Sequence, residues 1–202
     1  SPPDGHSVLL GGCYLTIAPS LYLKLPFDPE NDFAPVALLV SNQYVLVTHP
    51  SVPVSSVRDL IKLAKERPGR LNYGSAGIGS PPHLSGELFK TMAGLEINHI
   101  PYKGATPALV DLIGGHIDVY FGGISGTLPH IKSRKVRALA VTSERRSSQL
   151  PEVSTIAEAA LPGYDITTWF GLLAPAGTPK EIVGKLSTVM LSIANESETR
   201  AY

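Results

Sequence analysis

Short β-like runs alternate with helix-like segments along most of this chain, and this alternation restricts its fold more than any other feature. Apolar, β-rich runs occupy residues 71–75, 97–102, 117–122 and 136–143, and a helix-like segment follows each of them. A strand–helix–strand rhythm is typical of a parallel sheet that is covered by helices. The sequence therefore predicts an α/β fold.

Two β-like stretches are unusually long and have no helix between their halves. One joins the runs 36–40 and 44–50, and the other covers residues 164–175. We interpret each stretch as a crossing from one lobe to another. The expected lobes are residues 44–167 for one, and residues 1–43 together with 168–202 for the other, thinner lobe.

Capping signals mark the starts of several expected helices. Serine and threonine accept hydrogen bonds from first-turn N–H groups, and proline is tolerated in the first turn. The expected N-caps are Ser56, Ser80, Thr106 and Thr178, for the helices expected at 56–69, 81–93, 106–115 and 177–198, respectively.

The composition excludes several classes of protein. Of the 202 residues, 43% are hydrophobic and 17% are charged, and no apolar run approaches the roughly 20 residues of a membrane span. The net charge is zero, which argues against a nucleic-acid partner. A single cysteine excludes an internal disulfide, and the histidines show no metal-ligand spacing. The first six residues are polar and do not resemble a signal peptide. We expect neither a metal nor a cofactor.

The stretch "NYGSAGIGSPPHLSGELF", residues 72–89, places a glycine- and serine-rich turn before a helix. Such a turn can be a tight connection, a phosphate site or a site for another anion, because the first N–H groups of a helix lack partners. The glycine spacing matches neither a P-loop nor a dinucleotide fingerprint. A tight structural connection and a site for another anion both stay open. If an anion binds here, the expected contacts are Ser75, Ala76, Gly77, Gly79 and Ser80.

A second turn of the same design, "PYKGATPA", offers Gly104, Ala105 and Thr106 at the start of the next helix. Parallel sheets align such helix starts along one edge. The two turns could therefore hold two oxygens of one small anion, or one turn could hold the ligand and the other a bound water. His83 follows the first turn and could donate to an anion, or it could be a structural capping residue. No G-x-S-x-G motif of a serine hydrolase occurs.

Four segments match, in order, the motifs of one known family: "LNYGSAGIGSPPHLSGELFKTMAG", "HIPYKGATPALVDLIGGHIDVYF", "LPHIKSRKVRALAVTSERRSSQLPEVSTIAEAALPGY" and "WFGLLAPAGTP". They resemble the Bug family, the extracytoplasmic solute receptors of tripartite tricarboxylate transporters. The resemblance covers nearly the whole chain.

The resemblance implies a type II periplasmic-binding-protein fold, in which two α/β lobes, joined by two crossover strands, close on a small organic acid. The ligand would be held by backbone N–H groups of residues 75–80 and 104–106. Residues 12–16, with Cys13 and Tyr14, would replace a Ser/Thr-rich loop of the first lobe. Family members begin with a further βαβα stretch, so the resemblance also implies an incomplete first lobe and impaired ligand affinity.

The expected function is that of a periplasmic, TctC-like, monomeric binding protein and not of an enzyme. It would capture a small organic carboxylate between its lobes and deliver it to the membrane subunits of the transporter. Two alternatives stay open at this point. One is a carboxylate-sensing domain for a signalling partner, and the other is a hydrolase-type enzyme that uses His83 beside the anion site.

Overall fold

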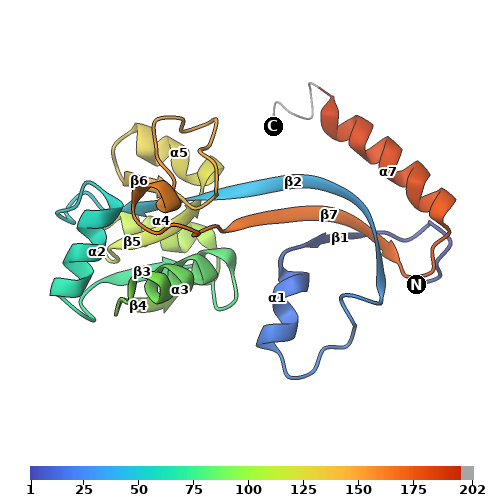
Figure 1. Ribbon diagram of the computed structural model, residues 1–202, viewed down its shortest axis with the longest axis horizontal. Coiled ribbons are helices and arrows are strands. Elements are labelled where there is room, and N and C mark those ends of the chain that lie inside the picture. The colour runs from blue at the N-terminus through green and yellow to red at the C-terminus, as the bar shows by residue number, and fades with distance from the viewer. Residues whose placement is uncertain (197–202) are drawn as a thin grey trace. The chain divides into compact units, whose positions relative to one another are not determined.

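The computed structural model describes residues 1–196 and shows strands that alternate with helices, as the sequence predicts (Figure 1). Within these residues, no helix combines the length and the apolar character needed to cross a membrane. In chain order the elements are β1 (Leu9–Gly12), α1 (Tyr14–Leu21), β2 (Phe33–Thr48), α2 (Val57–Glu66), β3 (Asn72–Ser75), α3 (Pro81–Ala93), β4 (Asn98–Pro101), α4 (Ala105–Ile113), β5 (Val119–Gly123), α5 (Ile124–Lys132), β6 (Arg137–Val141), α6 (Ile156–Ala159), β7 (Thr167–Pro175) and α7 (Lys180–Asn195).

The described chain forms two compact units. Unit 1 comprises residues 1–41 and 168–196, and unit 2 comprises residues 42–167. Both boundaries fall inside strands, one within β2 and the other within β7. These two strands therefore run from one unit into the other, as expected for crossover strands.

The sheet of unit 2 has a parallel part and an antiparallel part. The last residues of β2 pair antiparallel with β5 and with β6. Strand β3 lies between β4 and β5 and is parallel to both of them. The carboxyl ends of β3, β4 and β5 therefore lie at the same edge of the sheet.

Side chains of successive strand residues point to opposite faces of a sheet, and unit 2 uses this alternation to build two cores. Val119 and Phe121 of β5 belong to a core that α2, α3 and α6 cover. Tyr120, which lies between them, belongs to a second core with residues of α4 and α5. The sheet is thus covered by helices on both faces, which is the layering that the βα alternation predicts.

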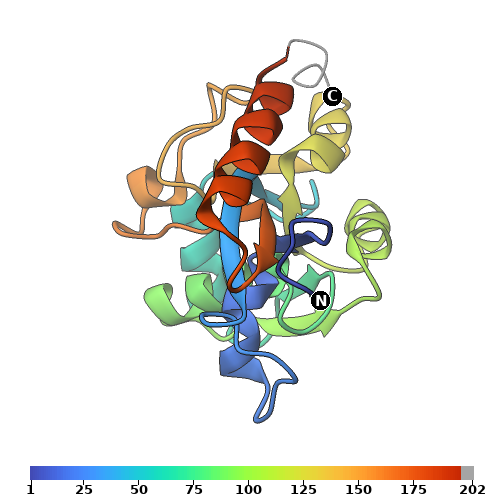
Figure 2. The ribbon, with the colours of Figure 1, turned by 90° about the vertical axis from the view of Figure 1, so that its right-hand side faces the viewer.

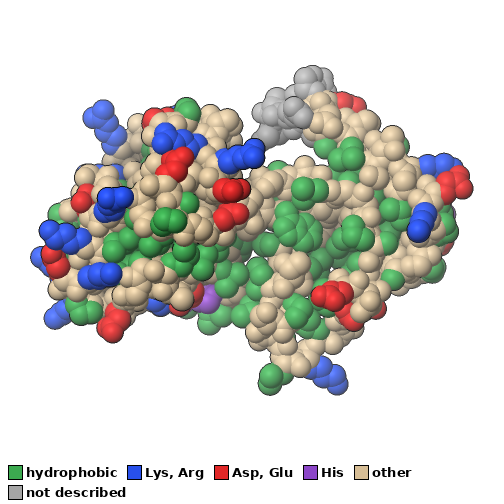
Figure 3. Space-filling model, viewed as in Figure 1, with side chains coloured by type: hydrophobic (Ala, Val, Ile, Leu, Met, Phe, Trp, Pro, Cys, Tyr) green, Lys and Arg blue, Asp and Glu red, His purple; other side chains and the backbone are tan. Residues whose placement is uncertain are grey.

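Unit 1 has a smaller core. Strand β1 pairs antiparallel with β7 (Figure 2). Helix α7 packs its apolar residues against Val36, Leu172 and Ala174. No residue of α7 is fully buried, and several large hydrophobic side chains of unit 1 are exposed, including Leu23 and Leu38. Figure 3 shows hydrophobic side chains gathered on the visible face of this unit.

Three expected helix starts differ from the structure. Helix α4 has Gly104 as its N-cap, so Thr106 is its second residue and does not cap it. Helix α7 has Pro179 as its N-cap, and the Thr178 hydroxyl donates to the Pro175 carbonyl at 2.8 Å instead. The sequence also predicts a short helix over "TLPHIKSRK", residues 127–135, but helix α5 begins at Ile124, three residues earlier. The last two residues of the helix expected at 177–198 lie outside the described chain.

Strand β2 joins the two predicted β-like runs in one continuous strand. It continues without a break because the polar residues between the two apolar runs include no glycine or proline. Both polar backbone groups of Tyr44 form hydrogen bonds with Thr142. Its N–H donates to the Thr142 hydroxyl at 3.2 Å, and its carbonyl accepts from the Thr142 N–H at 2.9 Å.

Gly86 allows α3 to approach β3 closely. A Cβ atom at position 86 would lie 2.2 Å from Cε2 of the buried Tyr73 ring. We expect Gly86→Ala to lower the free energy of unfolding by about 1–3 kcal/mol, because the ring or the helix must shift. Urea denaturation followed by circular dichroism measures this change.

Gly126 in α5 provides the matched control. A Cβ atom at this position meets no atom within 4 Å, and its φ lies outside the left-handed region. Gly126→Ala should leave the stability unchanged or raise it by roughly 0.5–1 kcal/mol, since alanine is the better helix former. Equal losses in both variants would contradict the close packing of α3 on Tyr73.

Candidate functional site

Three helices of unit 2 begin beside one edge of its parallel strands. Helix α3 begins six residues after Ser75, the last residue of β3. Helices α4 and α5 follow the ends of β4 and β5 even more closely. Helix starts present unpaired N–H groups and the positive end of the helix dipole, so this edge of the sheet favours negatively charged ligands.

The glycine loop, defined here as residues 75–80, is held mainly by hydrogen bonds within unit 2. The hydroxyl of Ser75 is fully buried, lies 2.6 Å from Nε2 of His99, and accepts from the Gly77 N–H at 3.1 Å. The Gly79 N–H donates to Nδ1 of His83 at 3.1 Å, and the Ser80 N–H donates to the Gly77 carbonyl. The N–H groups of Gly77, Gly79 and Ser80 therefore have partners in this structure, contrary to the expectation of an open anion site.

Ser80 occupies the N-cap position of α3, as expected, but its side chain plays another part. Its hydroxyl donates to the Gly77 carbonyl at 2.6 Å and does not bond to the helix. The N–H groups of Ala76, Ile78 and His83 have no acceptor within the described residues. These three groups are the donors that the glycine loop and the first turn of α3 still offer to a ligand.

In the second loop, residues 104–106, two backbone N–H groups have no acceptor within the described residues. The N–H groups of Ala105 and Thr106 lie in the first turn of α4, and residues 1–196 provide no acceptor for them. Gly104 adopts a φ of 120°, a conformation that favours glycine and turns the chain into the helix. Both Ala105 and Thr106 are exposed.

The two loops lie next to each other. The Tyr102 N–H donates to the Ser75 carbonyl at 3.0 Å, which ties the end of β4 to the start of the glycine loop. The Tyr102 carbonyl lies close to Gly77, at 3.4 Å from the position that a Cβ atom would take. The structure thus brings the predicted residues 75–80 and 104–106 together at one edge.

His83 belongs to a cluster of polar and aromatic side chains beneath the glycine loop. Its ring lies 4.3 Å from the ring of His99, and His99 stacks on Tyr73 at 4.8 Å between centroids. The Tyr73 hydroxyl donates to Oε1 of Glu87 at 2.6 Å, and Lys90 pairs with the same oxygen at 2.7 Å. The cluster therefore combines two imidazoles with one ion pair.

Burial and these contacts shift several pKa values. The pKa of Tyr73 is raised by burial and by the adjacent Glu87 carboxylate. Burial opposes ionisation of Glu87, but hydrogen bonds from Lys90 and Tyr73 outweigh it, so the pKa of Glu87 is lowered. The pKa of His99 is lowered, first by burial and then by the neighbouring His83. His99 is thus favoured in its neutral form.

Sequence reasoning missed the other members of this cluster. His99 lies in the β-like run 97–102, which predicts a structural role, and no sequence motif singles out Tyr73, Glu87 or Lys90. A signal was present, because His83, Glu87 and Lys90 are spaced i, i+4 and i+7 and so share one face of α3. The contact of this face with His99 depends on the pairing of β3 with β4, which the spacing does not reveal.

The start of α5 was also missed. Gly123 is its N-cap, and a groove of about 440 Å³ between α4 and α5 is lined by Thr106, Tyr120, Gly126 and His130 among others. The glycine pair at 122–123 before a helix-like segment was the available signal. This groove connects the second loop with the first turn of α5.

Cys13 and Tyr14 belong to unit 1. Cys13 occupies the N-cap position of α1, and its N–H donates to the Trp169 carbonyl at 3.2 Å. Burial raises the pKa of its thiol. The exposed Tyr14 donates its hydroxyl to the Leu10 carbonyl at 3.1 Å. These two residues are therefore held by contacts within unit 1.

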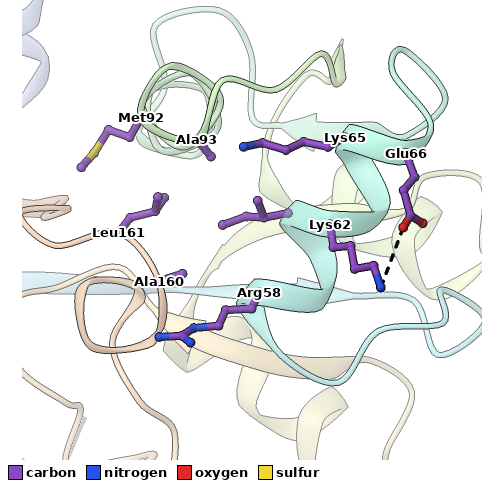
Figure 4. Close-up of a pocket in the computed structure, with 9 residues that line it drawn as sticks. Arg58, Lys62, Lys65, Glu66, Met92, Ala93, Ala160 and Leu161 are labelled. Atoms are coloured by element: carbon purple, nitrogen blue, oxygen red, sulfur yellow. Dashed lines mark ion pairs between the residues drawn. The ribbon is translucent and has the colours of Figure 1, made fainter.

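A groove of about 620 Å³ lies elsewhere on unit 2, between α2, the end of α3 and the residues after α6 (Figure 4). Arg58, Lys65, Met92 and Leu161 line it, and none of the sequence-predicted site residues does. Within residues 1–196, no group of three or more potential metal ligands occurs.

Ser75 is the residue on which the conformation of the glycine loop depends most directly. We expect Ser75→Ala to lower the free energy of unfolding by about 1–3 kcal/mol, because it removes a buried partner from His99 and from Gly77. Amide hydrogen exchange at Gly77 should accelerate. Ser125→Ala changes an exposed serine at the start of α5 and serves as the control. Unchanged exchange at Gly77 in the Ser75 variant would contradict this role.

Comparison with known proteins identifies relatives over most of the chain. Residues 1–201 match the TctC family, the "Tripartite tricarboxylate transporter family receptor". A UPF0065 protein from the tcbD–tcbE intergenic region of Pseudomonas sp. (strain P51) is 40% identical over 93% of this chain and 56% of its own length. Protein BugT of Bordetella pertussis is 38% identical over 91% of this chain and 57% of its own length. The chain thus spans a little over half the length of these relatives.

Solved structures of similar proteins also match most of the chain. Rpa4515 of R. palustris with adipate is 39% identical, with a TM-score of 0.86 over 98% of this chain and 67% of that one. The periplasmic binding protein BugD is 32% identical, with a TM-score of 0.85 over 100% and 67%. MatC of Rhodopseudomonas palustris with bound malate is 32% identical, with a TM-score of 0.82 over 100% and 69%. The fold is therefore that of the Bug-type periplasmic binding proteins, and the chain belongs to the TctC family of tripartite tricarboxylate transporter receptors.

Proposed function

We propose that this protein binds a small organic carboxylate in the periplasm and delivers it to the membrane subunits of a tripartite tricarboxylate transporter. Family membership supports the receptor role, and two relatives have been solved with adipate and with malate. The observation that carries the proposal is that Ala105 and Thr106, beside the glycine loop, are exposed and that their first-turn N–H groups have no acceptor within the described residues. Backbone N–H groups at a helix start bind carboxylate oxygens without a fixed positive side chain.

The proposed ligand contacts are the residues predicted from the sequence, but the start of α4 now precedes the glycine loop in importance. Ala105 and Thr106 would donate first, together with Ala76 and His83 of the glycine-loop region. Cys13 and Tyr14 stay candidates for contacts from unit 1. Likewise, we keep residues 44–167 as one proposed lobe and residues 1–43 and 168–202 as the other.

Catalysis is the less favoured alternative. Ser75 and His99 lie 2.6 Å apart, which is the distance of a serine–histidine nucleophile pair. The Ser75 side chain, however, is fully buried, and its oxygen already accepts the Gly77 N–H. Ser75 therefore stabilises the loop and is not accessible to a substrate. A sensing domain would use the same ligand contacts and would differ only in its protein partner.

Ala105→Pro removes one proposed donor with little structural change. Proline is tolerated at the first position of a helix, and Gly104 has an extended ψ of 173° that suits the residue before proline. We expect the affinity for adipate or malate to fall about tenfold or more, since a hydrogen bond to a charged group contributes about 1.5–3 kcal/mol. Isothermal titration calorimetry measures the loss.

Lys180→Pro is the matched control, because Lys180 is the first residue of α7 and is exposed. It should leave carboxylate affinity unchanged. If Ala105→Pro and the unmodified protein bind the carboxylate with equal affinity, the start of α4 is not part of the binding site. Capture of the transporter's membrane subunits by the immobilised protein would separate transport from sensing.

A further inference from the structure

Two histidines form hydrogen bonds that hold the glycine loop against the rest of unit 2. Nδ1 of His83 accepts the Gly79 N–H at 3.1 Å, and Nε2 of His99 lies 2.6 Å from the Ser75 hydroxyl. The two imidazole rings are only 4.3 Å apart. The conformation of the loop therefore depends on which ring nitrogens carry protons.

The bond from Gly79 fixes the proton position on His83. A nitrogen that accepts an N–H carries no proton itself, so His83 is neutral here, with its proton on Nε2. When a proton from water binds Nδ1, this nitrogen becomes a donor that faces the donor of Gly79. The two N–H groups then repel each other, unless an anionic oxygen lies between them and accepts both.

The surroundings make His99 a poor site for that proton. His99 is held between Tyr73 and His83, and burial lowers its pKa. Two positive rings at 4.3 Å would repel each other, so the pair takes up one proton and not two. The other charged groups of the cluster are Glu87 and Lys90, which are paired at 2.7 Å and largely offset each other.

We propose that carboxylate binding at the glycine loop takes up one proton at His83, so that Gly79 and His83 change from partners of each other into joint donors to the ligand. This inference rests on the proposed function and names its regulation by pH. The hydrogen bond that occupies the Gly79 N–H in this structure is thus the one that a proton removes.

The coupling has a definite sign. Because the bound state carries one proton more than the free state, affinity rises as the pH falls and His83 gains its proton. The limit for a single proton is a change of about tenfold in affinity per pH unit.

The test is calorimetric titration with adipate and with malate between about pH 6 and pH 8, in buffers of different ionisation enthalpy. We expect up to one proton to be taken up per carboxylate bound, and the affinity to fall toward pH 8. His83→Gln, which cannot titrate, should abolish both effects. His116→Gln removes an exposed histidine elsewhere in unit 2 and should retain them. The amide nitrogen resonance of Gly79 should shift with pH in the unliganded protein and not in His83→Gln.

The outcomes separate this inference from the proposed function. Carboxylate binding without proton uptake, or with an uptake that persists in His83→Gln, would overturn the inference and leave the function standing. A failure of both acids to bind at every pH would overturn the function and the coupling with it. In that case, the Gly79 resonance would still show whether His83 controls the loop.

Discussion

Parallel pairing of β3 with β4 and β5 is the constraint on which the rest of unit 2 depends. The register places Ser75 opposite Pro101 and Gly74 opposite Tyr120, so the strands end at a common edge. Each chain segment must then return along a face of the sheet, and the helices that do so begin where the strands end. A row of unpaired N–H groups at that edge follows from the topology before any particular ligand is considered.

Packing then decides how closely each helix start approaches the edge. Gly86 lets α3 lie against the ring of Tyr73, and the buried Tyr164 hydroxyl donates to the Ser85 carbonyl at 2.9 Å. These two contacts fix α3 on the sheet, and with it the end of the glycine loop. Ser75 and the two histidines fix the start and middle of the same loop. A loop that is ordered before the ligand arrives loses little conformational freedom on binding.

Much of this arrangement was predictable from the sequence, for physical reasons that also set the limits. Helix α3 was predicted with the correct bounds because Pro81 starts it and Gly94, with a φ of 62°, ends it. The starts of α4 and α7 were misplaced by one or two residues, because Gly104 and Pro179 cap their helices through backbone conformation and not through a side chain. Local signals therefore located the elements better than their ends.

The histidine cluster marks where local signals stop being informative. Ser75 and His99 are separated by 24 residues and meet only because β3 and β4 pair in one particular register. The pattern on α3 could indicate that His83, Glu87 and Lys90 share a face, but not that an imidazole from another strand would lie beneath them. This part of the site depends on long-range strand pairing, which local sequence patterns do not reveal.

The scarcity of fixed positive charge at this edge agrees with reversible binding. Lys103 is the only lysine or arginine in residues 75–80 and 101–108, and it is exposed. An arginine would hold a carboxylate through two charge-assisted bonds at every physiological pH, and its ligand would dissociate slowly. A histidine supplies the same unit of charge only while it is protonated. Neutral amides for recognition, combined with one titratable ring for charge, would let the protein retain a carboxylate and still release it.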